Sequence, residues 1–179
     1  VPLKDENRYL VQRGIEALKN SQNPWVKAMC EASGVKQQDI NEETIGFYFG
    51  PRLNAIGRLG DAMPGVEFLM SESTEQAEPL AKLLNQKNNE RKDIVNTITE
   101  EAIAMIESDE EIQNSLVLVV AKEGWNAGVV GIVASRLVGK YYKPTIILSI
   151  DREKGTAKGS ARSIEGFHLY DELAKNRDI

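Results

Sequence analysis

The chain has 179 residues, of which 41% are hydrophobic and 27% charged, and its net charge at pH 7 is −5. This balance is typical of a soluble globular protein with a core, and no apolar run approaches the roughly 18 residues of a membrane span. The single cysteine excludes an internal disulfide, and we predict a reducing, cytoplasmic setting. One cysteine and one histidine also argue against a zinc site and against a self-contained Cys–His or Ser–His–Asp catalytic set. We therefore predict no catalytic or metal-binding residue.

The charge is unevenly distributed along the chain. Residues 1–110 carry 12 Lys or Arg against 19 Asp or Glu, whereas residues 121–162 carry eight against three, a local net charge of +5. A small basic patch on an acidic protein suits contact with a few phosphates better than a broad grip on duplex DNA. An ordinary solvated surface gives similar counts, so both interpretations stay open.

The first 70 residues are predicted to be mainly helical. Apolar residues recur at helical spacing, and Asn20 to Pro24 and Ser33-Gly34 supply stop signals. The predicted elements are helices over 5–19, 25–32 and 41–49, a glycine-rich loop over 50–65 that begins at Gly50-Pro51, and a short helix over 66–70.

A long helix is predicted next. Ser73 to Gln76 resembles a capping box, although Pro79 favours a helix that starts nearer to it or kinks there. Apolar residues then keep a spacing of three to four as far as Ile106, apart from a wholly polar stretch over 86–92. A long helix with a polar middle is more typical of a connector between two bodies than of a core element. We therefore expect a domain boundary at this helix and divide the chain into residues 1–72, 73–110 and 111–179.

After residue 110 the pattern changes to alternating strand and helix. The uninterrupted apolar run over 116–120 predicts a buried strand. It is followed by a predicted helix over 127–140, a second buried strand over 145–150, a more polar strand over 156–163 and a last helix over 167–175. Strand–helix–strand implies a parallel crossover. The predicted fold class is α/β: a helical N-terminal segment, a long connecting helix, then a small, mainly parallel α/β domain.

The stretch over 158–163 has the composition of a phosphate-binding turn. Gly159 permits close approach of the backbone to an anion, and Ser160 and Ser163 can each donate a hydrogen bond. Arg162 adds a two-pronged guanidinium. The competing interpretation is a polar strand end without a binding role.

A second candidate region is the predicted loop over 50–65. Arg52, Asn54 and Arg58 lie there among glycines and a proline, and ordering such side chains is costly unless they hold something. We predict that they meet phosphates. The alternative is that Arg52 and Arg58 pair with acidic neighbours and cap helix ends.

Three further features have ordinary structural explanations. Glycines 124, 128 and 131 follow a strand and open a helix, but their spacing fits no nucleotide-binding motif, so we attribute them to close helix–sheet packing. Trp125 could stack on a base or anchor the core, and His168 could cap the last helix. Neither Trp125 nor His168 is assigned a role.

Three motifs together resemble the RecJ family of single-strand-specific DNA exonucleases, within the DHH phosphoesterase superfamily. They are GPRLNAIGRLGDA over 50–62, EGWNAGVVGIVASRL over 123–137 and KGSARSIEGF over 158–167. They occur in the family's order and the match spans nearly the whole chain. Asn126-Ala127 departs from the His-Pro that many relatives carry.

The resemblance implies a layout. RecJ-like proteins have a catalytic domain whose aspartates and Asp-His-His motif bind manganese or magnesium, a long connecting helix, and a DHH-associated α/β domain, with DNA in the cleft between. Residues 1–72 would be the helical tail of the catalytic domain, 73–110 the connector, and 111–179 the associated domain, truncated before the usual Gly-Gly-His segment. We therefore expect no cofactor in this part, and Mn or Mg in the missing catalytic domain.

The resemblance also implies a function: the substrate-binding part of a 5′→3′ single-stranded DNA exonuclease for DNA repair and recombination, inactive alone. Ser160 and Arg162 would hold the phosphate near the 5′ end, with Ser163, Arg52, Asn54 and Arg58 as further candidate contacts. The expected partners are single-stranded DNA and a helicase or single-strand-binding protein, without a membrane. Two alternatives remain: part of a phosphodiesterase for short oligonucleotides or signalling dinucleotides, or a non-catalytic protein-docking module.

Overall fold

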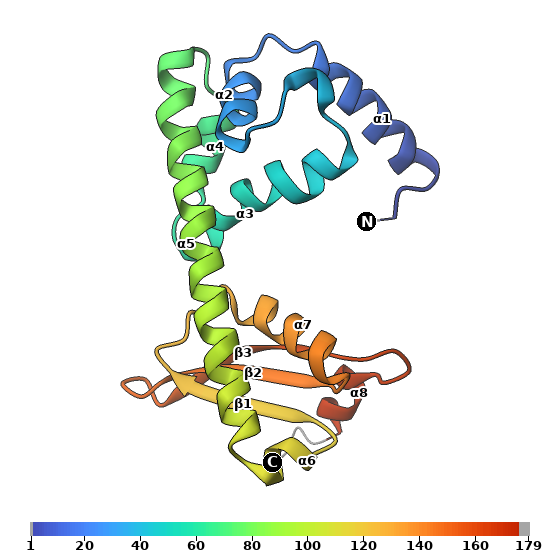
Figure 1. The fold of residues 1–179 in the computed structure, drawn as a ribbon, viewed down its shortest axis with the longest axis vertical. Helices are drawn as coiled ribbons and strands as arrows, with labels where there is room; N and C mark the ends of the chain where they lie inside the picture. Colours follow the sequence, from blue (N-terminus) through green and yellow to red (C-terminus); the bar gives the residue numbers. More distant parts are fainter. Residues whose placement is uncertain (1, 176–179) are drawn as a thin grey trace. The chain divides into compact units, whose positions relative to one another are not determined.

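The computed structural model describes residues 2–175, and it confirms the predicted fold class of a helical N-terminal part, a long helix and a small α/β part. The chain divides into two compact units, with the boundary between Arg91 and Lys92. That boundary falls inside helix α5 (Thr74–Glu107), in the polar stretch that the sequence marked (Figure 1).

The first unit is entirely helical. It contains the first part of α5 together with α1 (Asp5–Lys19), α2 (Pro24–Ser33), η1 (Gln37–Asp39), the π-helix η2 (Thr44–Phe49), α3 (Gly50–Leu59) and α4 (Met63–Leu69). Helix α2 ends as predicted at Gly34, whose φ of 71° is the left-handed conformation that glycine adopts readily.

The prediction of a loop over 50–65 was wrong, because residues 50–59 form helix α3 directly after η2. Pro51 lacks a backbone N–H and stands at the junction between the π-helix η2 and α3, where the helical hydrogen-bond pattern changes. Gly50 does not break the helix, and its role there is steric. A Cβ there would lie 2.9 Å from the carbonyl oxygen of Ile45, so only glycine fits the wide turn at the π-to-α junction.

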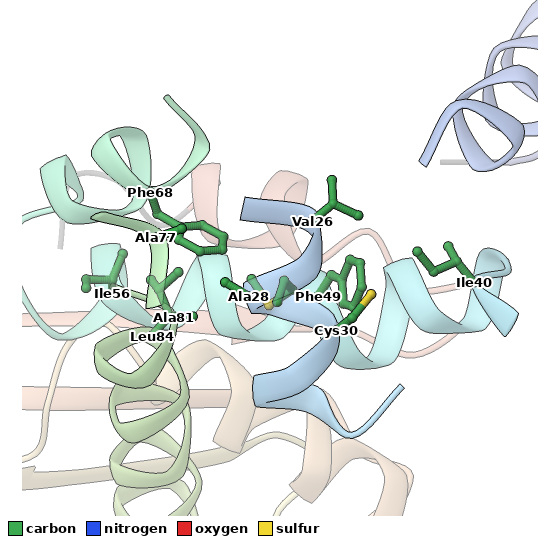
Figure 2. Close-up of a cluster of buried hydrophobic side chains, with 11 residues drawn as sticks. Val26, Ala28, Cys30, Ile40, Phe49, Ile56, Phe68, Ala77, Ala81 and Leu84 are labelled. Carbon is green, nitrogen blue, oxygen red and sulfur yellow. The ribbon is translucent and has the colours of Figure 1, made fainter. Parts of the chain in front are cut away.

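The core of the first unit is drawn in Figure 2. Side chains from α2, η2, α3, α4 and the start of α5 form one buried cluster, in which the rings of Trp25 and Phe68 meet edge to face with centroids 6.2 Å apart. Burial raises the pKa of the Cys30 thiol in this cluster. The labelled members are Val26, Ala28, Cys30, Ile40, Phe49, Ile56, Phe68, Ala77, Ala81 and Leu84.

Helix α5 begins at Thr74, so the alternative start near Pro79 was wrong. Its first turn is capped as the sequence predicted. The Ser73 hydroxyl accepts a hydrogen bond from the Gln76 amide at 3.4 Å, and the Gln76 side chain accepts one from the Glu72 amide at 3.1 Å. The cap and the burial of Ala77 offset the backbone hydrogen bond that Pro79 removes.

The second unit contains the rest of α5 and a three-stranded sheet of order β1-β2-β3. Strands β1 (Leu118–Glu123) and β2 (Thr145–Asp151) are parallel, as predicted, and helix α7 (Val130–Tyr141) connects them. Strand β3 (Thr156–Arg162) runs antiparallel to β2, with Thr145 opposite Arg162, so the sheet is mixed. Figure 1 shows α7 over one face of this sheet. The short helices α6 (Glu110–Asn114) and α8 (Leu169–Ala174) complete the unit.

The first strand and the following helix begin later than predicted. Leu116 is 87% exposed and lies outside β1, and within β1 the buried residues Leu118 and Val120 alternate with Val119, which is 48% exposed. The apolar run therefore did not indicate burial on both faces, because only alternate residues at the start of β1 are buried. Helix α7 starts at Val130 instead of residue 127, since residues 124–129 form a turn.

No helix within residues 2–175 is both long and apolar enough to span a membrane.

Candidate functional site

The Ser160 and Arg162 side chains form the centre of the candidate site. They occupy alternate positions of β3 and therefore stand on the same face of the sheet. The Arg162 Nη1 donates to the Ser160 Oγ at 2.9 Å and to the carbonyl oxygen of Ala161 at 2.8 Å. Both bonds use the same nitrogen, so the guanidinium is oriented while its remaining donors face away from these two acceptors. Arg162 is exposed to solvent.

Helix α7 lies directly against this pair. A Cβ built on Gly131, in the first turn of α7, would lie 2.9 Å from the Ser160 Oγ and 3.2 Å from the Arg162 Nη2. The glycine was predicted to permit close helix–sheet packing, and its partners are the two candidate side chains. Sequence analysis missed this link because residues 131 and 160 are far apart in the chain.

Gly159 has a structural role. A Cβ at this position would fall onto the carbonyl oxygen of Ile147, in the neighbouring strand β2. The close approach that the sequence indicated is therefore between two strands, and it holds the backbone of Ser160 in register opposite Ile147.

Ser163 follows the end of β3 and contributes to the next turn. Its hydroxyl donates to the carbonyl oxygen of Phe167 at 2.6 Å. Ser163 is exposed, and its oxygen keeps acceptor capacity. In this structure its hydroxyl proton is used in a hydrogen bond within the turn.

Arg52 holds together three elements of the first unit. Its Nε donates to the Asn85 Oδ1 at 3.0 Å, its Nη1 to the Tyr48 carbonyl at 2.8 Å and its Nη2 to the Ala32 carbonyl at 3.5 Å. Partial burial lowers the pKa of the guanidinium. Two of these partners are carbonyls near helix ends and none of the three is acidic, so the contacts match only the capping part of the alternative that the sequence left open.

Asn54 and Arg58 lie on a different side of α3 from Arg52. They are four residues apart, so they are neighbours on one helix face, and both are exposed. The candidate residues thus form two sets: Arg52, Asn54 and Arg58 in the first unit, and Ser160, Arg162 and Ser163 in the second.

Several cations of the basic segment over 121–162 are paired with carboxylates. Lys122 contacts Glu101 at 3.0 Å and Arg152 contacts Glu123 at 2.8 Å. Lys140 and Lys154 are likewise paired, each at 2.8 Å, with Glu107 and Asp151. Arg162 makes no ion pair within residues 2–175, so its charge is not offset by an adjacent protein carboxylate.

Trp125 is an anchor of the second unit. Its side chain is 5% exposed, and its indole Nε1 donates to the Glu101 Oε2 at 2.7 Å. The Trp125 carbonyl accepts from the Ser149 hydroxyl at 2.5 Å. The indole hydrogen bond, with Lys122 as second cause, lowers the pKa of the Glu101 carboxyl. A ring buried in this way joins α5 to the sheet and offers no face for base stacking.

No group of three His, Cys, Asp or Glu side chains among residues 2–175 is placed to hold a metal ion. These residues therefore do not fit a metal centre of their own.

Comparison with known proteins gives consistent matches. Residues 113–177 match the family model described as the DHHA1 domain. The chain is 50% identical over 179 residues to the single-stranded-DNA-specific exonuclease RecJ of Bacillus subtilis. It is 36% identical over 178 residues to the RecJ of Salmonella typhimurium.

A structural comparison finds the same family. RecJ from Thermus thermophilus, solved in complex with Mg²⁺ and with Mn²⁺, superimposes with a TM-score of 0.84 over 99% of this chain at 25% identity. The chain spans only part of each relative: 22% of the B. subtilis protein, 31% of the S. typhimurium protein and 27% of the Mg²⁺-bound T. thermophilus chain. The resemblance drawn from the three motifs is therefore confirmed: over its whole length the chain is similar in sequence and fold to part of RecJ, and residues 113–177 match the DHHA1 domain.

Proposed function

We propose that this chain forms the substrate-binding part of a 5′→3′ single-stranded DNA exonuclease, where it positions the strand and its 5′ phosphate. The observation that carries this proposal is the Arg162 guanidinium, which is exposed, without an ion pair in the described residues, and oriented by Ser160 and the Ala161 carbonyl. An oriented guanidinium beside a hydroxyl matches the geometry of a phosphate group.

In this proposal Arg162 donates to two phosphate oxygens through Nε and Nη2, the nitrogens that its two hydrogen bonds to Ser160 and Ala161 do not use. The Ser160 hydroxyl, which accepts from Nη1, keeps its own proton to donate to a phosphate oxygen. Ser163 is proposed as a further contact, which requires its hydroxyl proton to move from the Phe167 carbonyl to a phosphate oxygen. The site holds and orients the strand, a contribution of proximity, and transfers no proton itself.

Arg52, Asn54 and Arg58 are proposed as further phosphate contacts in the first unit. Asn54 and Arg58 are supported by their exposure on one face of α3. Arg52 has weaker support because it would give up hydrogen bonds to Asn85 or to helix-end carbonyls.

We further propose that residues 1–72 are the helical tail of the catalytic domain, 73–110 the connecting helix and 111–179 the DHH-associated domain. Mn or Mg would be held by a catalytic domain outside this chain, since the described residues form no metal site. The intact protein would act on single-stranded DNA in repair and recombination in the cytoplasm, with a helicase or single-strand-binding protein as its partner.

The test measures binding of single-stranded oligonucleotides that carry either a 5′ phosphate or a 5′ hydroxyl. Replacing Arg162 with Ala removes charge-assisted hydrogen bonds worth about 1.5–3 kcal/mol, so affinity for the 5′-phosphorylated strand should fall roughly ten- to a hundred-fold. The matched control is Arg152→Ala, which removes an exposed arginine already paired with Glu123.

The 5′-hydroxyl strand should bind wild type and Arg162→Ala with similar affinity. Equal affinity of wild-type protein for the two strands would refute the proposed 5′-end role. An equal loss in Arg152→Ala would show that only general charge matters.

A further inference from the structure

We infer that Gly131 is a positioning residue for the Ser160–Arg162 site, an inference that rests on the proposed function. The absence of a side chain at Gly131 lets the first turn of α7 lie against Ser160 and Arg162 without displacing the Ser160 hydroxyl that orients the guanidinium.

A side chain at Gly131 would clash with the candidate site. The nearest atoms to a Cβ on Gly131 are the Ser160 Oγ at 2.9 Å, the Arg162 Nη2 at 3.2 Å and the Ser160 Cβ at 3.3 Å. The shortest of these distances is below the range that real Cβ contacts reach, so a methyl group would displace the hydroxyl. Both affected side chains belong to the candidate site, and no other atom lies nearer.

The hydroxyl that would be displaced is the acceptor that orients Arg162. The Ser160 Oγ and the Arg162 Nη1 are 2.9 Å apart. A shift of the Ser160 side chain away from α7 lengthens this bond, and the guanidinium then keeps only the Ala161 carbonyl as a partner. A long side chain held by one hydrogen bond samples more rotamers, so less of the protein is ready to bind phosphate.

A second glycine of the same helix has no such contacts. Gly139 is also in α7, but a Cβ there would have nothing within 4 Å. Helix propensity would favour alanine over glycine at both positions. Only at Gly131 does packing against the site demand glycine, and this makes Gly139→Ala a closely matched control.

The experiment uses the 179-residue chain with oligo(dT) carrying a 5′ phosphate or a 5′ hydroxyl. Gly131→Ala should lower the preference for the 5′-phosphorylated strand about tenfold and leave affinity for the 5′-hydroxyl strand unchanged, because internal phosphates do not require the oriented guanidinium. Gly139→Ala should keep the wild-type preference. A purely structural role for Gly131 would weaken binding of both strands alike.

The steric origin is tested separately by thermal unfolding of Gly131→Ala, Ser160→Ala and the double variant. Removing the Ser160 hydroxyl removes the closest clash, so Gly131→Ala should cost less stability in the Ser160→Ala background than alone. Additive effects would overturn the inferred contact. If Gly131→Ala alone fails to fold, recovery of folding in the double variant supports the contact, and failure of both refutes it.

Different results would refute the role of Gly131 and the proposed function. Loss of phosphate preference in Arg162→Ala but not in Gly131→Ala would overturn the role of Gly131 and leave the proposed function intact. No preference in wild-type protein would overturn both.

Discussion

The hydrogen bond between the Trp125 indole and Glu101 can be tested by removing its acceptor. Trp125 is 5% exposed and donates to the Glu101 Oε2 at 2.7 Å, and Glu101 stands on α5 while Trp125 follows β1. Glu101→Ala leaves the buried indole N–H without this carboxylate. Glu100→Ala is the matched control, since Glu100 is an exposed neighbour on the same helix.

The expected cost follows from two contributions of different size. A buried donor that loses its partner costs about 1–3 kcal/mol. The Glu101–Lys122 ion pair is also lost, but its side chains are 37% and 46% exposed. Such a pair contributes only about 0–1 kcal/mol. We therefore expect Glu101→Ala to lower the free energy of unfolding of the second unit by about 2 kcal/mol, Lys122→Ala by less than about 1 kcal/mol, and Glu100→Ala by less than about 0.5 kcal/mol.

The assay is urea unfolding followed by tryptophan fluorescence in a Trp25→Phe background, where Trp125 alone reports on the second unit. A red shift of the folded-state emission should accompany Glu101→Ala, because the indole environment becomes wetter. A stability loss in Glu101→Ala no larger than that in Glu100→Ala would refute the anchoring role of the pair.

The same contact has a defined pH dependence. The pKa of Glu101 is lowered below its ordinary value of 4.5, first by the Trp125 hydrogen bond and then by Lys122. A lowered pKa means that the folded state favours the ionised carboxylate, so this stabilisation is complete above 4.5 and is lost as the pH falls through the folded-state pKa. The stability difference between wild type and Glu101→Gln should therefore be constant from about pH 6 to 8 and shrink at acid pH. A difference independent of pH would contradict this assignment.

Two further substitutions test the roles of residues at the candidate site. Arg52→Ala removes hydrogen bonds to Asn85, Tyr48 and Ala32. It should lower the free energy of unfolding of the first unit by about 2–3 kcal/mol, measured by urea unfolding followed by circular dichroism. The control Asn54→Ala, at an exposed position, should cost less than about 0.5 kcal/mol. An Arg52→Ala variant as stable as Asn54→Ala would show that those bonds contribute nothing. Gly159→Ala places a methyl group on the Ile147 carbonyl, and the overpacking should lower the free energy of unfolding by about 1–3 kcal/mol. The control Lys158→Ala, on the same strand, should leave stability nearly unchanged. Equal midpoints of the two variants in thermal unfolding would argue against the close strand contact.

Much of the local structure could be predicted from the sequence because its signals are local. The stop at Gly34, the cap at Ser73 and the parallel pair β1–β2 all follow from short patterns of residue type and hydrophobic spacing. Where two local signals conflicted, the prediction failed. Gly50-Pro51 indicated a break, but α3 continues directly from η2, with Pro51 at the junction where the hydrogen-bond pattern changes from π to α.

The composition of the candidate site was also visible in the sequence, since Ser160 and Arg162 stand two residues apart on a polar strand. Their geometry was not, because it depends on contacts between residues distant in the chain. Arg52 meets Asn85, Trp125 meets Glu101, and Gly131 meets Ser160 only after helices and strands have packed. The sequence by itself determined the order of the elements and the chemistry available to them. The tertiary structure alone decided which arginine serves the fold and which faces solvent, since that depends on the acceptors that packing brings within hydrogen-bonding distance of each guanidinium.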